Sequence, residues 1–466
     1  MAELYDEVKK RIEKGESLSE IKEKLIEQGF IESKIIETIS EYNSKEWESK
    51  SGYLKKAFAK EMLDKISYGF TSLQFINILF FSLGAAYSYF IIGLANGFKV
   101  VLSAITQSFI QKQPVKYINR RIIGINGILF GLTFLIIAAA GYYGSLLLFA
   151  ASFLIAGVSV VFYGGYYQEV ILGAKRGSRL MNILARYGLI ITAVSLVFAA
   201  YLMDKFSYGY LIIFSTAAVA FIISGLLLIF TNDVKSEKGK GGFWVSMGSA
   251  FSLNIIMENK GILKNKTAAI LLIAGLVTSI VQTIGNSYYG IIIYTKFGAT
   301  GFGGFLNVAM VFLIAVFSSL IGAIVTRINV REYGKFPLLV FGTLLLALMP
   351  LSYYYKPTLV TITMGTMFGI IGGAIIGFTQ GLLALDLNKE SRISYFSVSN
   401  VAMVFAYIIF VPLMAFIAQY YSIESLLLVL VAMLAAVIPL YLSVLLRNKK
   451  ILKNEFSLVQ KHEKIS

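Results

Sequence analysis

The sequence predicts an all-α polytopic membrane protein, and composition and hydropathy carry that prediction. Hydrophobic residues make up 57% of the 466 residues and charged residues only 15%, with a mean hydropathy of +0.73. Soluble domains average about 45–50% apolar and about 25% charged residues. From about residue 70 onward, apolar stretches of about 17–25 residues follow one another, each long enough to cross a bilayer as a helix.

Twelve such stretches are expected to span the membrane, in two groups of six. They cover residues 70–93, 97–112, 122–141, 144–169, 182–202, 209–231, 268–294, 302–326, 337–355, 357–384, 395–418 and 424–446. With a cytoplasmic N-terminus, this arrangement leaves only Lys99, Lys205, Lys296 and Lys356 on the outside, out of 42 lysines and arginines. Because cytoplasmic loops are enriched in these residues, both termini are expected in the cytoplasm. The expected location of the protein is the plasma membrane.

The charge excess follows the same topology. The formal net charge is +16, and residues 1–69 contribute 13 basic and 15 acidic groups, a net of −2. The remaining +18 therefore belongs to the membrane region, mostly to its cytoplasmic loops and tail. The excess indicates membrane topology rather than nucleic-acid binding.

The residue types that most enzymes need are scarce. The chain has no cysteine, and its single histidine, His462, lies in the C-terminal tail. No GxxxxGK[ST] phosphate loop occurs in the sequence. We therefore expect no metal, no cofactor and no enzymatic activity.

Residues 1–50 differ from the rest because many of them are charged and their apolar residues recur at helical spacing. We expect a cytoplasmic three-helix bundle, with Gly29 ending its second helix. The Gln28-Gly29-Phe30 turn resembles the Gly-Phe loop of ubiquitin-associated-like modules. That resemblance implies a cytoplasmic protein partner, and a generic helical cap on the membrane region is the alternative.

Residues 51–69 form a segment with an apolar side and a lysine-rich side. Phe58, Met62 and Ile66 share one face, whereas Lys56 and Lys60 lie on the remainder. The pattern predicts an amphipathic helix that lies on an anionic membrane surface. A plain linker helix is the alternative.

Three short matches between the two groups of spans indicate an internal duplication. Ser178-Arg179-Leu180 and Ser391-Arg392-Ile393 are 213 residues apart, and Gly165-Tyr166-Tyr167-Gln168 and Gly377-Phe378-Thr379-Gln380 are 212 apart. Lys116–Arg121 matches Arg331–Lys335 at a similar offset. The sequence therefore predicts two pseudo-symmetric halves, 70–231 and 268–446, with a cytoplasmic linker at 232–267 and a basic tail at 447–466.

These motifs resemble those of the major facilitator superfamily. Asn119-Arg120-Arg121 and Tyr333-Gly334-Lys335 match the last positions of its basic loop motif, although the motif's aspartate is absent from both copies. Tyr166-Tyr167-Gln168-Glu169-Val170, followed by Arg176-Gly177, resembles the sugar-porter signature that ends span four, without its proline. The resemblance implies a secondary transporter whose halves face each other across a central pathway.

Uncharged polar side chains recur on spans one, four, seven and ten, which line the central cavity in the family that this chain resembles. The candidate cavity residues are Gln74, Asn77, Tyr163, Tyr167, Gln282, Asn286, Tyr289 and Gln380. Amides and phenols suit neutral, hydroxyl-rich or amphipathic solutes. Hydrogen bonding between helices is the alternative role for these residues.

Charged residues at the cytoplasmic span ends are candidates for gating. We expect Glu169 to pair with Arg176 or Arg179, and Asp386 to pair with Arg392. Arg120 and Arg121 belong to the same group through the basic loop motif. Proton coupling at Glu169 is the alternative, because ionisable groups near the hydrocarbon are functional candidates by default.

The expected function is secondary transport of a small neutral or weakly charged solute by alternating access. Its expected partners are that solute, the lipid bilayer and a cytoplasmic protein bound through residues 1–50, with no nucleic acid. The alternative is a membrane receptor or scaffold that does not transport and acts through the N-terminal bundle.

Overall fold

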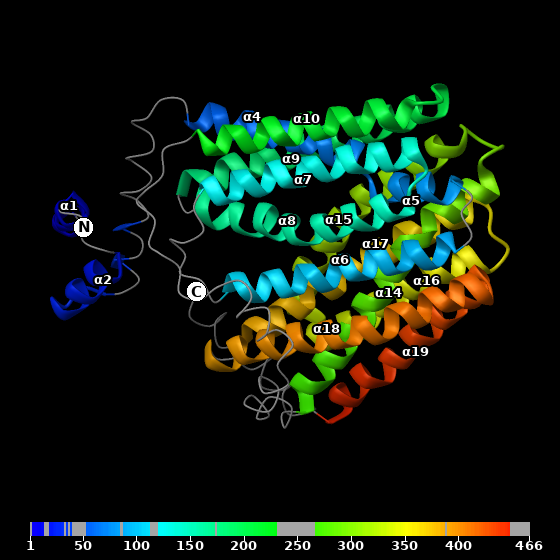
Figure 1. Cartoon of the computed structure of the whole chain (residues 1–466). Coiled ribbons are helices and arrows are strands. Elements are labelled where there is room, and N and C mark those ends of the chain that lie inside the picture. Colours follow the sequence, from blue (N-terminus) through cyan, green and yellow to red (C-terminus); the bar gives the residue numbers. More distant parts are fainter. Residues whose placement is uncertain are drawn as a thin grey trace.

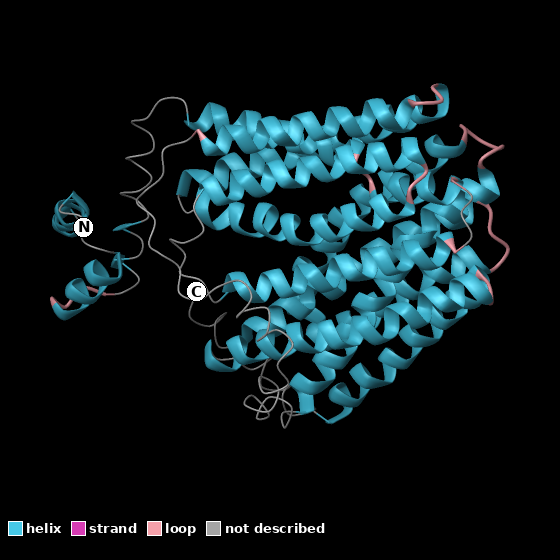
Figure 2. Cartoon of the chain, in the orientation of Figure 1, coloured by secondary structure: helices cyan, strands magenta, loops and turns pink. Residues whose placement is uncertain are grey.

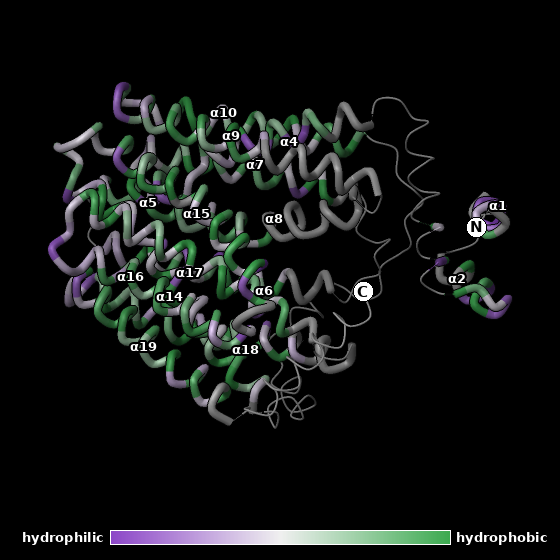
Figure 3. Tube along the Cα trace, turned by 180° about the vertical axis from the view of Figure 1, so that it is seen from behind, coloured by the Kyte–Doolittle hydropathy of each residue, from purple (hydrophilic) through white to green (hydrophobic). Residues whose placement is uncertain are grey.

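The computed structural model describes residues 2–13, 18–31, 34–35, 38–39, 53–83, 87–111, 120–172, 175–230, 266–386 and 389–447. These residues form helices and the turns that join them, as Figure 2 shows. Hydrophobic residues dominate the long helices, and hydrophilic ones mark α1, α2 and the loops (Figure 3).

The membrane region divides into two groups of helices. The first group comprises α4 (Tyr53–Phe70), α5 (Leu73–Ser82), α6 (Ser88–Gln111), α7 (Arg120–Tyr143), α8 (Leu146–Leu172), α9 (Lys175–Lys205) and α10 (Gly209–Ile229). The second comprises α14 (Lys266–Phe297), α15 (Gly304–Tyr333), α16 (Lys335–Tyr354), α17 (Leu359–Asp386), α18 (Lys389–Tyr420) and α19 (Ile423–Arg447). We refer to these groups as the first half and the second half.

Helix pairing repeats between the two halves. In the first half α7 packs against α8 and α10, α6 against α8, and α4 against α10. In the second half α16 packs against α17 and α19, α15 against α17, and α14 against α19. Each pair recurs in the same chain order, which agrees with the duplication that the sequence matches indicate. The halves meet through α6 with α18, α5 with α14, and α9 with α15 (Figure 1).

Ten helices of the described residues are long and apolar enough to cross a membrane. The described apolar part of α8, Leu146–Ser159, is shorter, and the α4–α5 region lies outside this set. The protein is therefore an all-α, multi-pass membrane protein.

The boundary expected between residues 93 and 97 is wrong. α6 runs without interruption from Ser88 to Gln111, and α5 ends at Ser82. Gly97 packs against α18, where an added Cβ would lie 2.2 Å from Val411 Cγ1. Gly97, expected at the start of a span, therefore lies inside α6 and allows close packing of two helices.

The position of α4 also differs from a helix lying on the membrane surface. It packs against α9 and α10 and buries Lys60, Glu61 and Asp64, whereas Phe58 is exposed. α4 does have an apolar and a polar side, but the polar side faces other helices. The physical reason is that charged groups are costly in lipid whereas apolar groups are not, so the charged side chains are buried against protein.

The N-terminal segment has a small core of its own. α1 (Ala2–Glu13) and α2 (Leu18–Glu27) bury Leu4, Val8, Ile21 and Leu25, together with Ile35. Gly29 has φ +87, and Phe30 N–H donates to the Leu25 carbonyl at 3.0 Å. This is the Schellman pattern expected at the end of α2, so the prediction for Gly29 is confirmed. The third helix and its resemblance to a ubiquitin-associated module stay predictions.

Candidate functional site

Gln74 of α5 joins the two halves by inserting its side-chain amide into α14. Its Nε2 donates to the Asn286 carbonyl at 2.9 Å, and its Oε1 accepts from the Gly290 N–H at 2.9 Å. These two backbone groups are also the i and i+4 partners of an α-helical hydrogen bond, and α14 is continuous through them. Gly290 allows this approach, because an added Cβ there would lie 2.5 Å from Gln74 Oε1.

Asn77, one turn further along α5, makes a second connection to α14. Its Nδ2 donates to the Ser287 carbonyl at 3.1 Å, and its Oδ1 accepts from Nδ2 of Asn96 on α6 at 3.2 Å. All three side chains in this chain of amides, Gln74, Asn77 and Asn96, are buried. The first half therefore binds backbone groups of α14 through side-chain amides, without ionic contacts.

Three further contacts lie at the same end of the bundle. Tyr288 donates its hydroxyl to the Tyr89 carbonyl at 2.9 Å. Asp204, at the end of α9, accepts from the N–H groups of Phe305 and Leu306 at 3.0 and 2.9 Å. The positive end of the α15 dipole favours a carboxylate at this position. The side chain of Gln419 accepts from the N–H of Phe90 at 3.3 Å.

Within the described residues, every hydrogen bond between the halves belongs to this group. We call the end of the bundle that they occupy the closed end, defined by the contacts of Gln74, Asn77, Tyr288, Asp204 and Gln419. It includes α5 and the α9–α10 and α14–α15 connections, toward the right of Figure 1.

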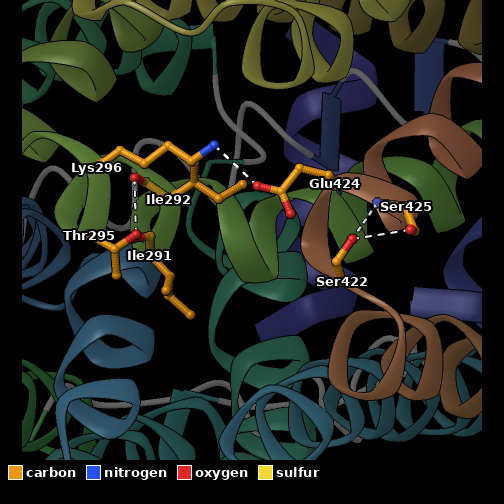
Figure 4. A network of polar contacts seen from close by, with 7 residues as sticks. All are labelled: Ile291, Ile292, Thr295, Lys296, Ser422, Glu424 and Ser425. Atoms are coloured by element: carbon orange, nitrogen blue, oxygen red, sulfur yellow. Dashed lines mark hydrogen bonds and ion pairs between the residues drawn. The ribbon is translucent and has the colours of Figure 1, made fainter.

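A salt bridge fastens two helices of the second half at the closed end. Lys296 Nζ lies 3.2 Å from Glu424 Oε1, joining the last turn of α14 to the first turn of α19 (Figure 4). Beside it, Ser422 accepts from the Ser425 N–H at 3.0 Å and caps α19. Both charged side chains are exposed enough that the pair contributes little stability.

The polar face of α14 continues toward the opposite end of the helix. Ser279 and Thr283 share the Tyr407 hydroxyl of α18, each at 2.8 Å. Gln282 is half-buried, and its Nε2 lies beside Gly373 of α17, 2.8 Å from the position of an added Cβ. Asn286 is also half-buried. The described residues supply no hydrogen-bond partner for either side-chain amide.

The other second-half candidates are engaged with protein. Gln380 donates to the Tyr441 hydroxyl at 3.0 Å. Tyr289 is 2% exposed and lies against the Tyr353 ring, with ring centroids 4.5 Å apart. These two positions fit the alternative role of contacts between helices as well as that of a cavity wall.

The side chains of the remaining candidates lie outside the described residues. They are Tyr163, Tyr167, Glu169, Arg176, Arg179, Arg120, Arg121, Asp386 and Arg392. Nothing in the structure tests the expected gating pairs. Among the described residues, no group of three or more His, Asp or Glu side chains could hold a metal ion.

Sequence reasoning missed several charged residues inside the bundle. Lys60 Nζ lies 2.7 Å from Asp64 Oδ2 and 3.2 Å from Glu61 Oε1, and Ser224 of α10 donates to Asp64 at 2.6 Å. Lys99 lies within α6 rather than in an outside loop. The helical spacing of polar residues in α4 did indicate a polar face that includes Lys60. The expectation of a surface helix placed that face in water rather than inside the bundle.

Comparisons with known proteins identify the fold. No protein-family model matches the sequence, and no curated protein matches it. The nucleoside transporter NupG is similar in structure, with a TM-score of 0.63 and 11% identity over 84% of this chain and 98% of that one. The partially occluded inward-open xylose transporter XylE from E. coli has a TM-score of 0.55 and 10% identity over 83% and 97%.

A structure from work on proton-dependent oligopeptide transporters is similar too, with a TM-score of 0.54 and 10% identity over 84% of this chain and 99% of that one. At such identities the likeness shows the fold alone. The chain therefore has the fold of these solved transporters, and the sequence motifs by their resemblance imply a transporter fold as well. These structural neighbours are transporters rather than enzymes.

Proposed function

We propose that the protein is a secondary transporter that moves a small neutral or weakly charged solute by alternating access. The hydrogen bonds between the halves carry this proposal, because those formed by the described residues gather at the closed end. Few side-chain hydrogen bonds hold that end, and each can be exchanged for water or for another protein group when the halves rock. The transporter fold supports the same mechanism.

In this proposal the halves are residues 70–231 and 268–446, with α4 added to the first. α4 and α5 together form the first of twelve crossings, and α6 forms the second. Residues 1–50, the linker at 232–267 and the tail at 447–466 lie in the cytoplasm. The closed end then faces outward, and the protein is in the plasma membrane.

The solute binds between the halves, where α14 presents the amides of Gln282 and Asn286. Gln74 and Asn77 close the outer side of this site, and Tyr163, Tyr167, Tyr289 and Gln380 complete its wall. The cytoplasmic gate consists of Glu169 with Arg176 and Arg179, Asp386 with Arg392, and the loop residues Arg120 and Arg121. Glu169 is the site to examine for proton coupling.

Solute flux into proteoliposomes tests the proposal. Uridine and xylose are the first solutes to measure, since a nucleoside transporter and a xylose transporter share the fold. If neither is taken up, a ligand screen by thermal shift selects further solutes, because a ligand that binds the folded state raises its stability. We expect Gln282→Ala and Asn286→Ala to reduce flux at least about tenfold each, as loss of a ligand hydrogen bond in a dry site does.

Thr216→Val is the matched control, since Thr216 is exposed on α10 and bonds only its own helix. Unchanged flux in both amide variants would contradict the site. Absence of flux for every solute that stabilises the protein would contradict the transport function.

The second candidate is a receptor or scaffold that acts through residues 1–50, and the separate core of that segment supports it. Deletion of residues 1–50 distinguishes the two. If transport continues after the deletion, the segment is accessory to transport. If the full chain shows no flux and the deletion abolishes binding of a cytoplasmic protein, the scaffold is supported.

A further inference from the structure

Lys99 occupies the middle of a helix that crosses the membrane. It is the twelfth of the 24 residues of α6, about 16 Å along the axis from Ser88. Its side chain is half-buried, and its Nζ lies over the Phe153 ring of α8, 5.6 Å from the centroid. The ammonium group therefore lies between two protein helices, at a depth where charge is costly.

The neighbouring helices offer this ammonium no carboxylate. The sequences of α5, α6 and α7 contain no acidic residue, and α8 contains only Glu169. Gly157 marks where α8 passes α6, since an added Cβ there would lie 2.8 Å from the Lys99 carbonyl. Glu169 is twelve residues further along α8, about 18 Å away. A charged side chain inside a membrane bundle ordinarily has a counter-charge, and among the described residues none lies beside the half-buried Lys99.

Asn96, one turn before Lys99 on α6, has an unpaired acceptor. The amide is 3% exposed, and its Nδ2 donates to the Ile92 carbonyl and to Asn77 Oδ1. Asn77 must present its oxygen to Asn96, because its own Nδ2 donates to the Ser287 carbonyl. This fixes the orientation of Asn96 and leaves Asn96 Oδ1 with no partner in the described structure. Buried acceptors of this kind nearly always have a donor.

The two unmatched groups lie on the same side of α6. A separation of three residues places Asn96 and Lys99 within about 60° around the helix. Gly97 contacts α18, whereas Asn96 bonds to Asn77 of α5 and Lys99 lies over Phe153 of α8. Asn77 then connects this face to α14 at the closed end.

We propose that Lys99 and Asn96 bind a small hydroxy- or amino-carboxylate. The carboxylate supplies the missing counter-charge to Lys99, and the adjacent O–H or N–H donates to Asn96 Oδ1. Phe153 forms an apolar wall beside the ligand. The inference deepens the proposed transport, since it assigns the solute to the weakly charged class, but binding itself does not depend on transport.

Thermal unfolding of the full-length purified protein tests the site with matched acids and amides. Lactate is compared with lactamide, and mandelate with mandelamide, at equal ionic strength and equal chloride concentration. We expect at least one acid to raise Tm with increasing concentration and its amide to act at least about tenfold more weakly. If neither acid raises the Tm of the wild-type protein more than its amide does, the proposal is overturned.

Lys99→Gln is expected to abolish the difference between acid and amide. Lys205→Gln is the control, because Lys205 is exposed at the end of α9 and should leave the difference unchanged. A difference that persists in Lys99→Gln overturns the proposal.

The absence of cysteine allows a stricter test of the charge. Lys99→Cys introduces a unique thiol that aminoethyl methanethiosulfonate converts into an ammonium-bearing side chain, whereas the hydroxyethyl reagent adds similar bulk without charge. Restoration of the acid preference by the first reagent alone supports the site. Restoration by both reagents, or by neither in protein shown by mass to be modified, overturns it.

Flux measurements separate this inference from the proposed function. Binding of lactate or mandelate without its uptake into proteoliposomes would contradict transport and leave the site intact. Uptake of uridine or xylose without any acid preference would contradict the site and leave transport intact.

Discussion

Gln74 shows how one side chain connects the halves reversibly. Its amide is bonded to the carbonyl of Asn286 and the N–H of Gly290, which can pair with each other when Gln74 leaves. Release therefore leaves no backbone group of α14 without a partner. The free-energy difference between the bound and the released state of Gln74 is consequently small, as the proposed alternation between two states would require.

Gln74→Leu is expected to favour opening of the closed end. Two hydrogen bonds contribute about 2 kcal/mol, so the population of open protein should rise about thirtyfold. The measurement is the rate at which a membrane-impermeant maleimide labels Asn286→Cys, the unique thiol of that variant. Thr216→Val is the control, and equal labelling rates with and without Gln74→Leu would contradict this role.

Lys60 is expected to stabilise the first half through its two carboxylates. Lys60→Met leaves Glu61 and Asp64 buried without this counter-charge, which should lower the free energy of unfolding by about 3–5 kcal/mol. Thermal unfolding in detergent measures the effect. Lys205→Met, at an exposed position, should change stability by less than about 0.5 kcal/mol. Similar Tm values for the two variants would show that the buried cluster is not ionised as a unit.

At the scale of elements, the glycines of α6 determine how closely it approaches α18. Gly97 lies against Val411, and Gly93 lies against Ala415 and the Tyr288 hydroxyl. Small residues at such contacts allow two helix backbones to come together. The α6–α18 contact is also the most extensive one between the halves. The distance between these two helices therefore affects both the stability of the protein and any movement of one half against the other.

Gly97→Ala is expected to destabilise the protein by about 1–3 kcal/mol, the usual cost of overpacking. Val411→Ala, combined with it, should recover most of the loss because the clashing methyl groups are removed. Gly377→Ala is the control, since nothing lies within 4 Å of an added Cβ there, and it should be neutral or slightly stabilising. Thermal unfolding of the variants compares them, and additive effects of Gly97→Ala and Val411→Ala would contradict the proposed contact.

At the scale of the whole molecule, the proposed transport requires the halves to separate at the closed end, so that the proposed solute site can face outward. Crosslinking tests this directly. An added Cβ at Gly97 would lie 2.9 Å from Val411 Cβ, about 1 Å closer than the usual Cβ–Cβ distance in a disulfide. A small outward shift of α6 from α18 brings the pair Gly97→Cys and Val411→Cys to disulfide geometry, so we expect it to form a crosslink under an added oxidant, and that disulfide should reduce solute flux at least about tenfold.

Reduction of the disulfide should restore flux, and each single-cysteine variant should keep its flux under oxidation. Full flux through the crosslinked protein would contradict separation of the halves between α6 and α18. Because the natural chain has no cysteine, the crosslink can be assigned to this pair alone.

The sequence indicated the type of residue in the candidate site but not the partner of each one. Polar residues at helical spacing indicated Gln282 and Asn286, and among the described residues neither side-chain amide has a hydrogen-bond partner. The same spacing selected Gln74 and Asn77, which bond to α14, and Tyr289, which is buried against Tyr353. Spacing identifies a face of one helix, but the neighbour of that face depends on contacts between residues about 200 positions apart.

The sequence by itself determined the membrane class, the helical content, the duplicated organisation and the Gly29 cap. These follow from hydropathy, period and local backbone geometry, which each short segment carries on its own. Only the tertiary structure decided that α4 buries Lys60, Glu61 and Asp64, that Gly97 lies within a helix, and that Lys99 lies at mid-helix with no carboxylate beside it among the described residues. The physical reason is that the cost of a charge and the role of a glycine depend on what packs against them, and long-range helix pairing sets that environment.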